Sequence, residues 1–294
     1  MRLSAAVDLH IHSTFSDGES TPAELVDLAV SQGLAAISIT DHDTAAGTGA
    51  ALHRAEGKGV EVIPGIEISA WHGDTSMHIL GYCFNPEDGR FIERLKLLQD
   101  GRETRNARIL AKLNRLGIRV AAEELQHYSR YGQTGRPHIA RLLVDKRVTE
   151  SVELAFKHYL RRGAAAYAER FRFSAHDAIS MIREAGGFAV LAHPANLDPS
   201  LRTIPFLLQD LNRAGLTGVE VYYPSHSAKA VKALLQMAAR LNLCVTGGSD
   251  FHGPDREAAK TEQWLEKTHI PYDIVMQIKL QRCGEKNFLR QRGA

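Results

Sequence analysis

The stretch that decides the fold lies near the N-terminus and reads Val7-Asp8-Leu9-His10-Ile11-His12-Ser13. Side chains alternate between the two faces of a β-strand, so His10 and His12 project to one side while their apolar neighbours face a packed interior. Such a strand could simply present a polar face at a sheet edge. Two histidines among apolar residues, followed closely by the turn-forming Ser16-Asp17-Gly18, favour a metal site instead.

Length and composition are those of an ordinary globular protein. The chain has 294 residues, of which 44% are hydrophobic, 24% charged and 7% aromatic, enough for one large domain or two small ones. No apolar run approaches membrane-spanning length, and the chain reaches Asp8 and His10 too soon for a signal peptide. We therefore expect a cytoplasmic protein without membrane association, and nothing in the sequence indicates an obligate protein partner.

The cysteines exclude two kinds of site. Cys83, Cys244 and Cys283 are odd in number, widely spaced and in no CxxC arrangement. Neither a disulfide framework nor a cysteine-zinc site is indicated. A metal in this protein would need nitrogen and oxygen ligands.

Charge is distributed unevenly. Residues 100–170 contain 15 Lys and Arg against 8 Asp and Glu, although the whole chain has a formal charge of only +2. This asymmetry indicates an anionic ligand held between two parts of the molecule, whereas a solvated helical surface would explain the same basic residues without a ligand.

Short buried strands alternate with helices along most of the chain. A helix is predicted after residue 20, with Thr21 as its N-cap, Pro22 in its first turn, Glu24 completing a capping box and Gly33 ending it. Seven short apolar runs are predicted as strands, at residues 7–11, 35–40, 60–69, 77–82, 187–193, 218–223 and 243–249.

Nearly all of these strands deliver a histidine or a carboxylate at one end. The residues concerned are His10, His12, Asp41, His42, Asp43, Glu67, His78, His193, His226, Asp250 and His252. Glu67 is notable because burying a carboxylate between two isoleucines is costly unless a cation or hydrogen-bond donors meet it. A (β/α) barrel gathers its functional groups at the C-terminal ends of its strands, so the pattern predicts one convergent site.

The basic block at residues 100–167 contains no convincing strand and is predicted to be an inserted helical subdomain. Its first helix has an apolar stripe of Ile109, Leu110, Leu113 and Leu116, flanked by Arg105, Arg108, Lys112 and Arg115. The predicted organisation is a barrel whose first part spans 1–99, the insertion 100–167, and the second part of the barrel 168–294.

The motifs in order resemble the polymerase and histidinol phosphatase (PHP) family. They are His10-Ile11-His12, Ser16-Asp17-Gly18, Asp41-His42-Asp43, Gly65-Ile66-Glu67, His78, Ala192-His193-Pro194 and Ser249-Asp250-Phe251-His252. The resemblance implies an α/β fold, a distorted (β/α)7 barrel with the helical segment inserted into it, and a phosphoesterase centre of two or three divalent metal ions.

The resemblance also implies which residues hold each ion. His10, His12, Glu67 and Asp250 would hold the first; Glu67 would bridge to a second held by His78 and His193; Asp17, His42 and His252 would hold the third. Asp17 stands where many members of the family have a histidine. Histidine and carboxylate ligands fit Mn²⁺, Zn²⁺ or Fe²⁺, of which we favour Mn²⁺.

Within the family, the insertion resembles the branch of 3',5'-nucleotide bisphosphate phosphatases and 5'-3' exoribonucleases. Substrate contacts are predicted for Arg136 and His138 in Gly135-Arg136-Pro137-His138, and for Ser225 and His226. A planar guanidinium suits bidentate phosphate contact, although Arg136 could equally be a solvated residue at a helix start.

The leading hypothesis is a phosphatase that removes the 3'-phosphate from 3',5'-bisphosphate nucleotides by attack of a metal-bridging hydroxide. Glu67, Asp250 and His193 would be catalytic, with Asp43 and His226 as candidate general acids. The alternative is a 5'-3' exoribonuclease on short 5'-phosphorylated RNA, although such enzymes usually carry aromatic stacking platforms, here limited to Tyr128, Tyr131 and Phe156 in the insertion. A histidinol phosphatase and a non-catalytic nucleotide or metal sensor are weaker alternatives.

Overall fold

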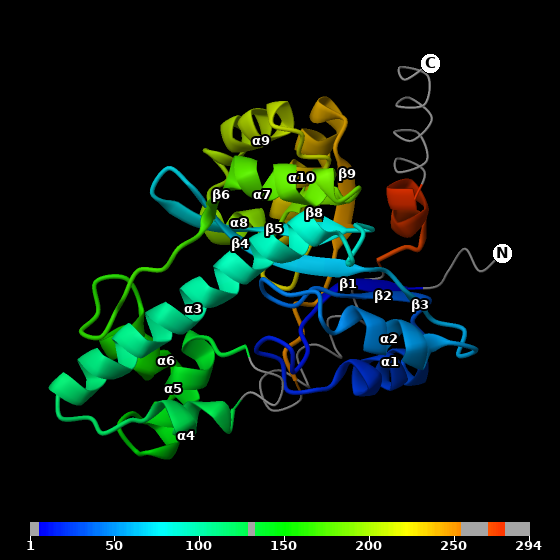
Figure 1. Cartoon of the computed structure of the whole chain (residues 1–294). Helices are drawn as coiled ribbons and strands as arrows, with labels where there is room; N and C mark the ends of the chain where they lie inside the picture. The colour runs from blue at the N-terminus through cyan, green and yellow to red at the C-terminus, as the bar shows by residue number, and fades with distance from the viewer. Residues whose placement is uncertain (1–5, 129–132, 254–269, 280–294) are drawn as a thin grey trace.

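The computed structural model describes residues 6–128, 133–253 and 270–279, so Tyr131 and Cys283 lie outside the described residues. Their strands form two sheets (Figure 1), one of order β1-β2-β3 and one of order β6-β4-β5-β7-β8-β9. The strands are β1 (Val7–Ile11), β2 (Ala36–Ile39), β3 (Glu61–Val62), β4 (Gly65–His72), β5 (Thr75–Tyr82), β6 (Phe173–Ser174), β7 (Phe188–Leu191), β8 (Gly218–Tyr222) and β9 (Cys244–Gly247).

Backbone hydrogen bonds join the two sheets at both ends. The His12 N–H donates to the carbonyl of Phe251, just beyond β9, at 2.8 Å. The Asp43 N–H, just beyond β2, donates to the carbonyl of Glu67 in β4 at 2.9 Å. The strands β1, β2, β4, β5, β7, β8 and β9 therefore close into a ring, which is the distorted seven-stranded barrel that the sequence predicts.

One strand of the ring runs against the others. β5 pairs antiparallel with both β4 and β7, whereas β7, β8 and β9 are parallel to one another. The first half of β5 thus lies at the end of the barrel where the parallel strands finish. This direction explains why His78 lies early in its strand while the other candidate residues follow the ends of theirs.

Helices cover the outer face of the larger sheet and pack on it through the largest apolar core. Ile68 and Ala70 of β4 belong to this core together with Ile179 and Leu208 of the helices. The covering helices are α7 (Ala175–Glu184), α8 (Pro194–Leu197), α9 (Ile204–Arg213) and α10 (Ala228–Leu241). Among the described residues no helix combines the length and apolarity needed to cross a bilayer.

The predicted N-terminal helix is confirmed as α1 (Pro22–Ser31), which packs with α2 (Thr48–Ala55) beside the smaller sheet. The Thr21 hydroxyl accepts from the Glu24 N–H at 3.2 Å, and the Glu24 carboxylate accepts from the Thr21 N–H at 2.7 Å. These two bonds satisfy N–H groups that have no partner within the helix. Gly33 follows the helix with a φ of +70°, a conformation that glycine adopts without strain.

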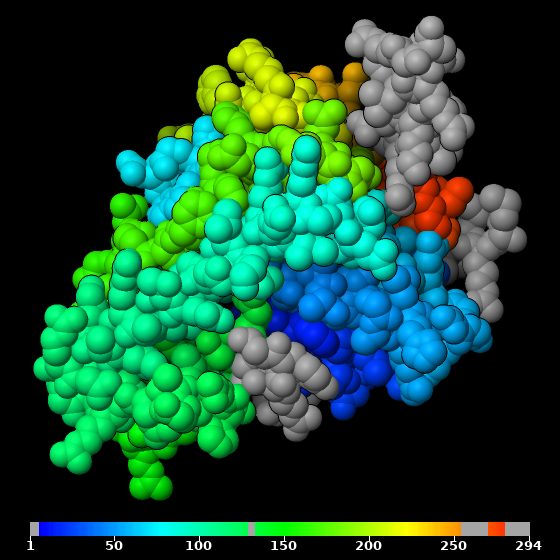
Figure 2. All heavy atoms as spheres, viewed as in Figure 1, coloured from blue at the N-terminus to red at the C-terminus, as the bar shows by residue number. Residues whose placement is uncertain are grey.

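The basic block, at the lower left of Figure 2, is helical. It has an apolar core of its own. Its members include Ile109 and Leu113 of the long helix α3, whereas Leu116, predicted in the same stripe, is 52% exposed. The helices are α3 (Gly89–Arg115), α4 (Ala122–Gln126), α5 (Arg136–Asp145), α6 (Val152–Ala155) and the π-helical turn η1 (Phe156–Leu160). A separate core supports the predicted subdomain, whose boundaries stay a prediction.

We expect Gly248→Ala to destabilise the protein by about 1–3 kcal/mol, because a Cβ at this position would lie 2.3 Å from both the Cβ and the backbone nitrogen of His10. Gly89→Ala is the matched control, since a Cβ there meets nothing within 4 Å and should change stability by less than about 0.5 kcal/mol. Chemical denaturation measures both. Equal stability of the two variants would contradict the close packing of β1 against the segment after β9.

Candidate metal centre

The carboxylate of Glu67 lies at the middle of the barrel mouth and is 1% exposed. Its Oε1 is 2.8 Å from His78 Nδ1 and 3.1 Å from His193 Nε2, and its Oε2 is 2.9 Å from His42 Nδ1. The Nε2 atoms of His10 and His12 approach the same carboxylate at 3.5 and 3.3 Å. Burial alone would raise the pKa of Glu67, but these imidazoles outweigh it and hold the pKa well below its usual value.

A first group of potential ligands consists of His10, His12, Glu67 and Asp250, with the four ligand atoms within 4.8 Å of one another. Asp250 Oδ1 is 3.0 Å from His12 Nε2 and 3.3 Å from His10 Nε2. Burial would lower the pKa of His12, yet Asp250 and Glu67 raise it to about 10. The structure therefore brings together the four residues predicted for the first ion.

Two further groups adjoin the first. His78 Nδ1 lies 3.3 Å from His193 Nε2 beside Glu67, as expected for the second ion. Asp17 Oδ1 lies 3.4 Å from His252 Nε2 and 4.0 Å from His42 Nε2, as expected for the third. The His42 ring connects these two groups because its Nδ1 faces Glu67. All nine predicted positions thus converge, and their assignment as ligands stays a prediction.

The potential ligand atoms converge, but several of them have no hydrogen-bond partner. Several are buried and close together yet make no hydrogen bond, namely the Nε2 atoms of His10 and His12, Nδ1 of His42 and Oε2 of Glu67. Buried polar atoms almost always have a partner, so such a convergent set is typical of ligands that surround a cation.

Glu220 orients two of the histidines and was not singled out from the sequence. This fully buried side chain in β8 contacts His10 Nδ1 at 2.8 Å through Oε1 and accepts from the His193 N–H at 2.7 Å through Oε2. Fixing Nδ1 of His10 directs its Nε2 toward Glu67 and Asp250. The signal was available, because a glutamate between Val219 and Val221 is as costly to bury as Glu67.

Three residues of the mouth adopt left-handed backbone conformations. The φ angles are +57° at Asp43, +29° at His193 and +56° at Asp250. Aspartate and histidine tolerate this region better than most side chains, but the conformation is still costly and persists where the surroundings impose it. For Asp250, the Tyr223 hydroxyl supplies one constraint by donating to its Oδ2 at 2.7 Å.

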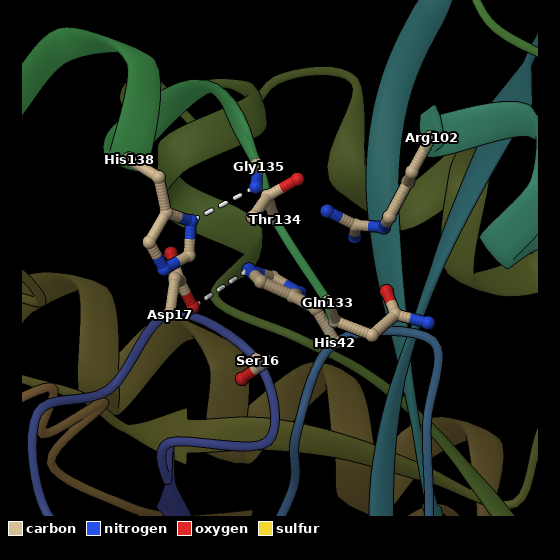
Figure 3. A pocket seen from close by; sticks show the side chains of 8 residues that line it. All are labelled: Ser16, Asp17, His42, Arg102, Gln133, Thr134, Gly135 and His138. Carbon is tan, nitrogen blue, oxygen red and sulfur yellow. Dashed lines mark hydrogen bonds and ion pairs between the residues drawn. The ribbon is translucent and has the colours of Figure 1, made fainter. Parts of the chain in front are cut away.

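A narrow cleft opens beside the third group. It is lined by Asp17 and His42 of the barrel, by Arg102 of α3, and by Gly135 and His138 at the start of α5 (Figure 3). The Gly135 N–H donates to His138 Nδ1 at 2.9 Å, which holds this imidazole at the start of α5 beside Asp17. The cleft therefore places groups from the insertion next to potential metal ligands.

Arginines gather behind this cleft. We call Arg102, Arg105, Arg136, Arg170 and Arg172 the arginine cluster. Burial lowers the pKa values of the last four, and the charges of neighbouring members lower them further. Arg102 Nε and Arg170 Nη1 both donate to Asp43 Oδ2, at 2.6 and 2.9 Å. The carboxylates of Asp43 and Glu169 raise pKa values within the cluster, whereas neighbouring guanidinium groups lower them.

Arg105 is the most unusual member of the cluster. The sequence placed it on the charged flank of its helix, but it is only 4% exposed, because the insertion folds over that side of α3. Its Nε donates to Asn106 Oδ1 at 2.9 Å, whereas its Nη2 is buried without a hydrogen bond. Burial and the neighbouring Arg102 and Arg170 lower its pKa well below the usual value. Such a group favours an anion.

Of the predicted substrate residues Arg136, His138 and Ser225, only His138 lines the cleft. Arg136 donates to the carbonyl of Leu160 at 3.3 Å and stacks over Phe156, so it is not the solvated helix-start residue considered above. Ser225 donates to Asn196 Oδ1 at 2.9 Å. His138 lines the cleft itself.

The pKa values of both candidate general acids are lowered. Burial would raise the pKa of Asp43, but Arg102 and Arg170 hold it well below its usual value, so the carboxylate stays ionised. Burial lowers the pKa of His226, whose Nδ1 contacts the carbonyl of Val221 at 2.8 Å. A catalytic role for either residue therefore stays a prediction, and the geometry supports a positioning role for Asp43.

Residues 8–172 match the PHP domain. The chain belongs to the PHP family. It is 34% identical over 262 residues to the 3',5'-nucleoside bisphosphate phosphatase of Chromobacterium violaceum, covering 88% of this chain and 92% of that one. It is also 34% identical over 248 residues to a 5'-3' exoribonuclease of Haemophilus influenzae, covering 84% and 90%.

A solved structure supports the same assignment. A predicted metal-dependent phosphoesterase from Bifidobacterium adolescentis superposes with a TM-score of 0.84 at 31% identity, covering 95% of this chain and 96% of that one. This PHP protein is accordingly a metal-dependent phosphoesterase, which excludes the non-catalytic sensor.

Apparent affinity for Mn²⁺ should rise with pH. Carboxylates raise the pKa values of His10 and His12, so these nitrogens hold protons that a bound metal must displace. Each displaced proton contributes about a tenfold change in affinity per pH unit. Calorimetry in two buffers of different ionisation enthalpy measures the protons released. His53→Gln, a change at an 87% exposed histidine, is the control, and binding without proton release would contradict the assignment.

Proposed function

We propose that this PHP phosphoesterase removes the 3'-phosphate from 3',5'-bisphosphate nucleotides. The observation that carries the proposal is the arginine cluster next to the metal centre, with buried guanidinium nitrogens of Arg105 and Arg172 that make no hydrogen bond. A substrate with two phosphates satisfies both parts of the site. One phosphate meets the metal centre and the other meets the arginines.

The spatial order of the two parts supports this assignment. Arg102 lines the same cleft as Asp17 and His42, and it also belongs to the arginine cluster. A group in the cleft therefore contacts potential metal ligands on one side and the Arg102 guanidinium on the other. A substrate with only one phosphate group would leave either the metal centre or the arginine cluster without a phosphate.

His10, His12, Glu67 and Asp250 would hold one ion, His78 and His193 with Glu67 a second, and Asp17, His42 and His252 a third, and we favour Mn²⁺ for this nitrogen and oxygen donor set. Bound ions would lower the pKa of water and stabilise charge on phosphorus. The protein's own contribution is orientation. Glu220 fixes His10, Tyr223 fixes Asp250, and Asp43 holds Arg102 and Arg170 in place.

A 5'-3' exoribonuclease is the second candidate. The relative from Haemophilus influenzae has the same 34% identity as the bisphosphate phosphatase relative, so similarity alone does not separate them. The cleft geometry favours the smaller substrate, because the part of it that the structure describes is narrow and lined by polar side chains without an aromatic platform. We further propose a cytoplasmic location, where such nucleotides occur.

A comparison of turnover with the two substrates tests the proposal. We expect turnover of a 3',5'-bisphosphate nucleotide to exceed that of a 5'-phosphorylated ribo-oligonucleotide at equal concentration, measured as phosphate and mononucleotide release by the Mn²⁺-loaded protein. Faster release of mononucleotides from the oligonucleotide would replace the phosphatase with the exoribonuclease.

We expect Glu67→Ala and Arg105→Ala to change different kinetic parameters. Removing Glu67 takes away the carboxylate that five imidazoles face, so we expect loss of bound metal and of turnover with every substrate. Removing Arg105 deletes one charged contact, worth about 1.5–3 kcal/mol or roughly ten- to a hundredfold, and should mainly raise KM for the bisphosphate.

Two controls accompany the Arg105 variant. Arg115→Ala removes an exposed guanidinium near the end of the same helix and should leave KM unchanged. A nucleoside 3'-monophosphate lacks the second phosphate, so Arg105→Ala should affect it much less than the bisphosphate. An equal effect on both substrates would show that Arg105 supports the fold rather than the second phosphate.

A further inference from the structure

Three potential metal ligands meet on the outside of the barrel, apart from the centre described above. His72 ends β4, His176 lies in the first turn of α7, and Asp210 lies in α9. The Nε2 atoms of His72 and His176 lie 3.2 and 2.7 Å from the same oxygen, Oδ2 of Asp210. In Figure 1 these elements gather at the upper part of the molecule, around β6.

This second group cannot share ions with the barrel mouth. Glu67 and His72 are five residues apart on β4, so their side chains project from opposite faces of the strand. At about 3.3 Å per residue they are separated by roughly 16 Å along it. His72 lies on the same face as Ile68 and Ala70, which pack against the helices, whereas Glu67 points into the barrel.

Local structure holds the three side chains in place before any ligand binds. β6 pairs with the end of β4, matching Trp71 with Ser174, so the residues that follow each partner lie side by side. Ser174 also caps α7 by accepting from the Asp177 N–H at 3.0 Å, which fixes His176 in the first turn. The two imidazole centroids are consequently 5.7 Å apart.

We propose that His72, His176 and Asp210 form a peripheral site for a divalent transition metal, with Zn²⁺ as the best fit. Two imidazoles and one carboxylate are a common ligand set for zinc, and ligands at about 2.0–2.2 Å from one ion lie roughly 3 Å from each other. Both imidazole nitrogens lie at about this distance from Asp210 Oδ2, and the three ligand atoms are within 4.8 Å of one another. Side-chain exposures of 31%, 51% and 44% leave room for water to complete the coordination. A bound ion would tie the β4–β5 hairpin to α7 and α9.

Metal content tests this site independently of activity. The proteins are equilibrated with Zn²⁺ by dialysis, and bound zinc per chain is measured by mass spectrometry for the wild type, His72→Gln/His176→Gln and His53→Gln. We expect the double variant to bind one Zn²⁺ fewer than the other two proteins. Zinc should also raise the Tm of the wild type and of the control by more than it raises that of the double variant.

Asp210→Asn provides a second variant in case the double substitution disturbs folding. It should weaken zinc binding at the peripheral site by roughly tenfold or more while the Mn²⁺-loaded protein keeps its turnover. Equal zinc content and equal Tm shifts in all four proteins would overturn the proposal and leave the three side chains as an ordinary hydrogen-bonded group. Because turnover is measured separately, that result would not bear on the phosphatase assignment.

Discussion

The burial of the Glu67 carboxylate is the constraint on which the rest of the structure depends. A carboxylate taken out of water costs several kcal/mol unless positive partners meet it. Here five imidazoles from four segments of the ring approach one side chain, and other carboxylates in turn raise the pKa values of His10 and His12. Burying the carboxylates and imidazoles is therefore stable only when all of them are present together. Each strand must bring its side chain to Glu67, and the backbone hydrogen bonds that close the ring lie beside these same residues.

Much of this arrangement could be predicted because it follows from short-range periodicity. The alternation of residues 7–11 put His10 and His12 on one side, and Glu67 was recognisable from the cost of burying it. The direction of β5 could not be predicted in this way. A run of apolar residues indicates a strand but does not tell whether the strand is parallel or antiparallel to its neighbours, so it did not show at which end of the barrel His78 lies. Arg105 was misplaced for a related reason. Helical spacing identifies the face of α3 on which Arg105 lies, but only tertiary packing determines what covers that face.

The arginine cluster exists only when the insertion lies against the barrel. Its members come from α3, from the start of α5 and from the segment that leads into β6, while the carboxylate that fixes two of them, Asp43, follows β2. Within the insertion, Arg105 of α3 is linked through Asn106 to the segment before α5, because the Asn106 amide donates to the carbonyl of Thr134 at 3.0 Å. Mutual repulsion among guanidinium groups opposes this assembly. A bound anion would relieve the repulsion, so substrate binding and docking of the insertion are expected to stabilise each other.

The β4–β5 hairpin connects these features because its two faces have different partners. One face carries Glu67 into the metal centre and, further along, Trp71, over whose ring Arg172 of the arginine cluster stacks at 4.0 Å. Arg172 also donates to Ser76 Oγ at 2.5 Å on the returning strand, two residues before His78. The opposite face carries Ile68, Ala70 and His72 toward the helices. A shift of this hairpin by one residue would exchange the two faces and remove Glu67 from its imidazoles. Contacts at the far end of the hairpin, with Arg172 on one face and with His176 and Asp210 on the other, therefore help to fix the register that the metal centre requires.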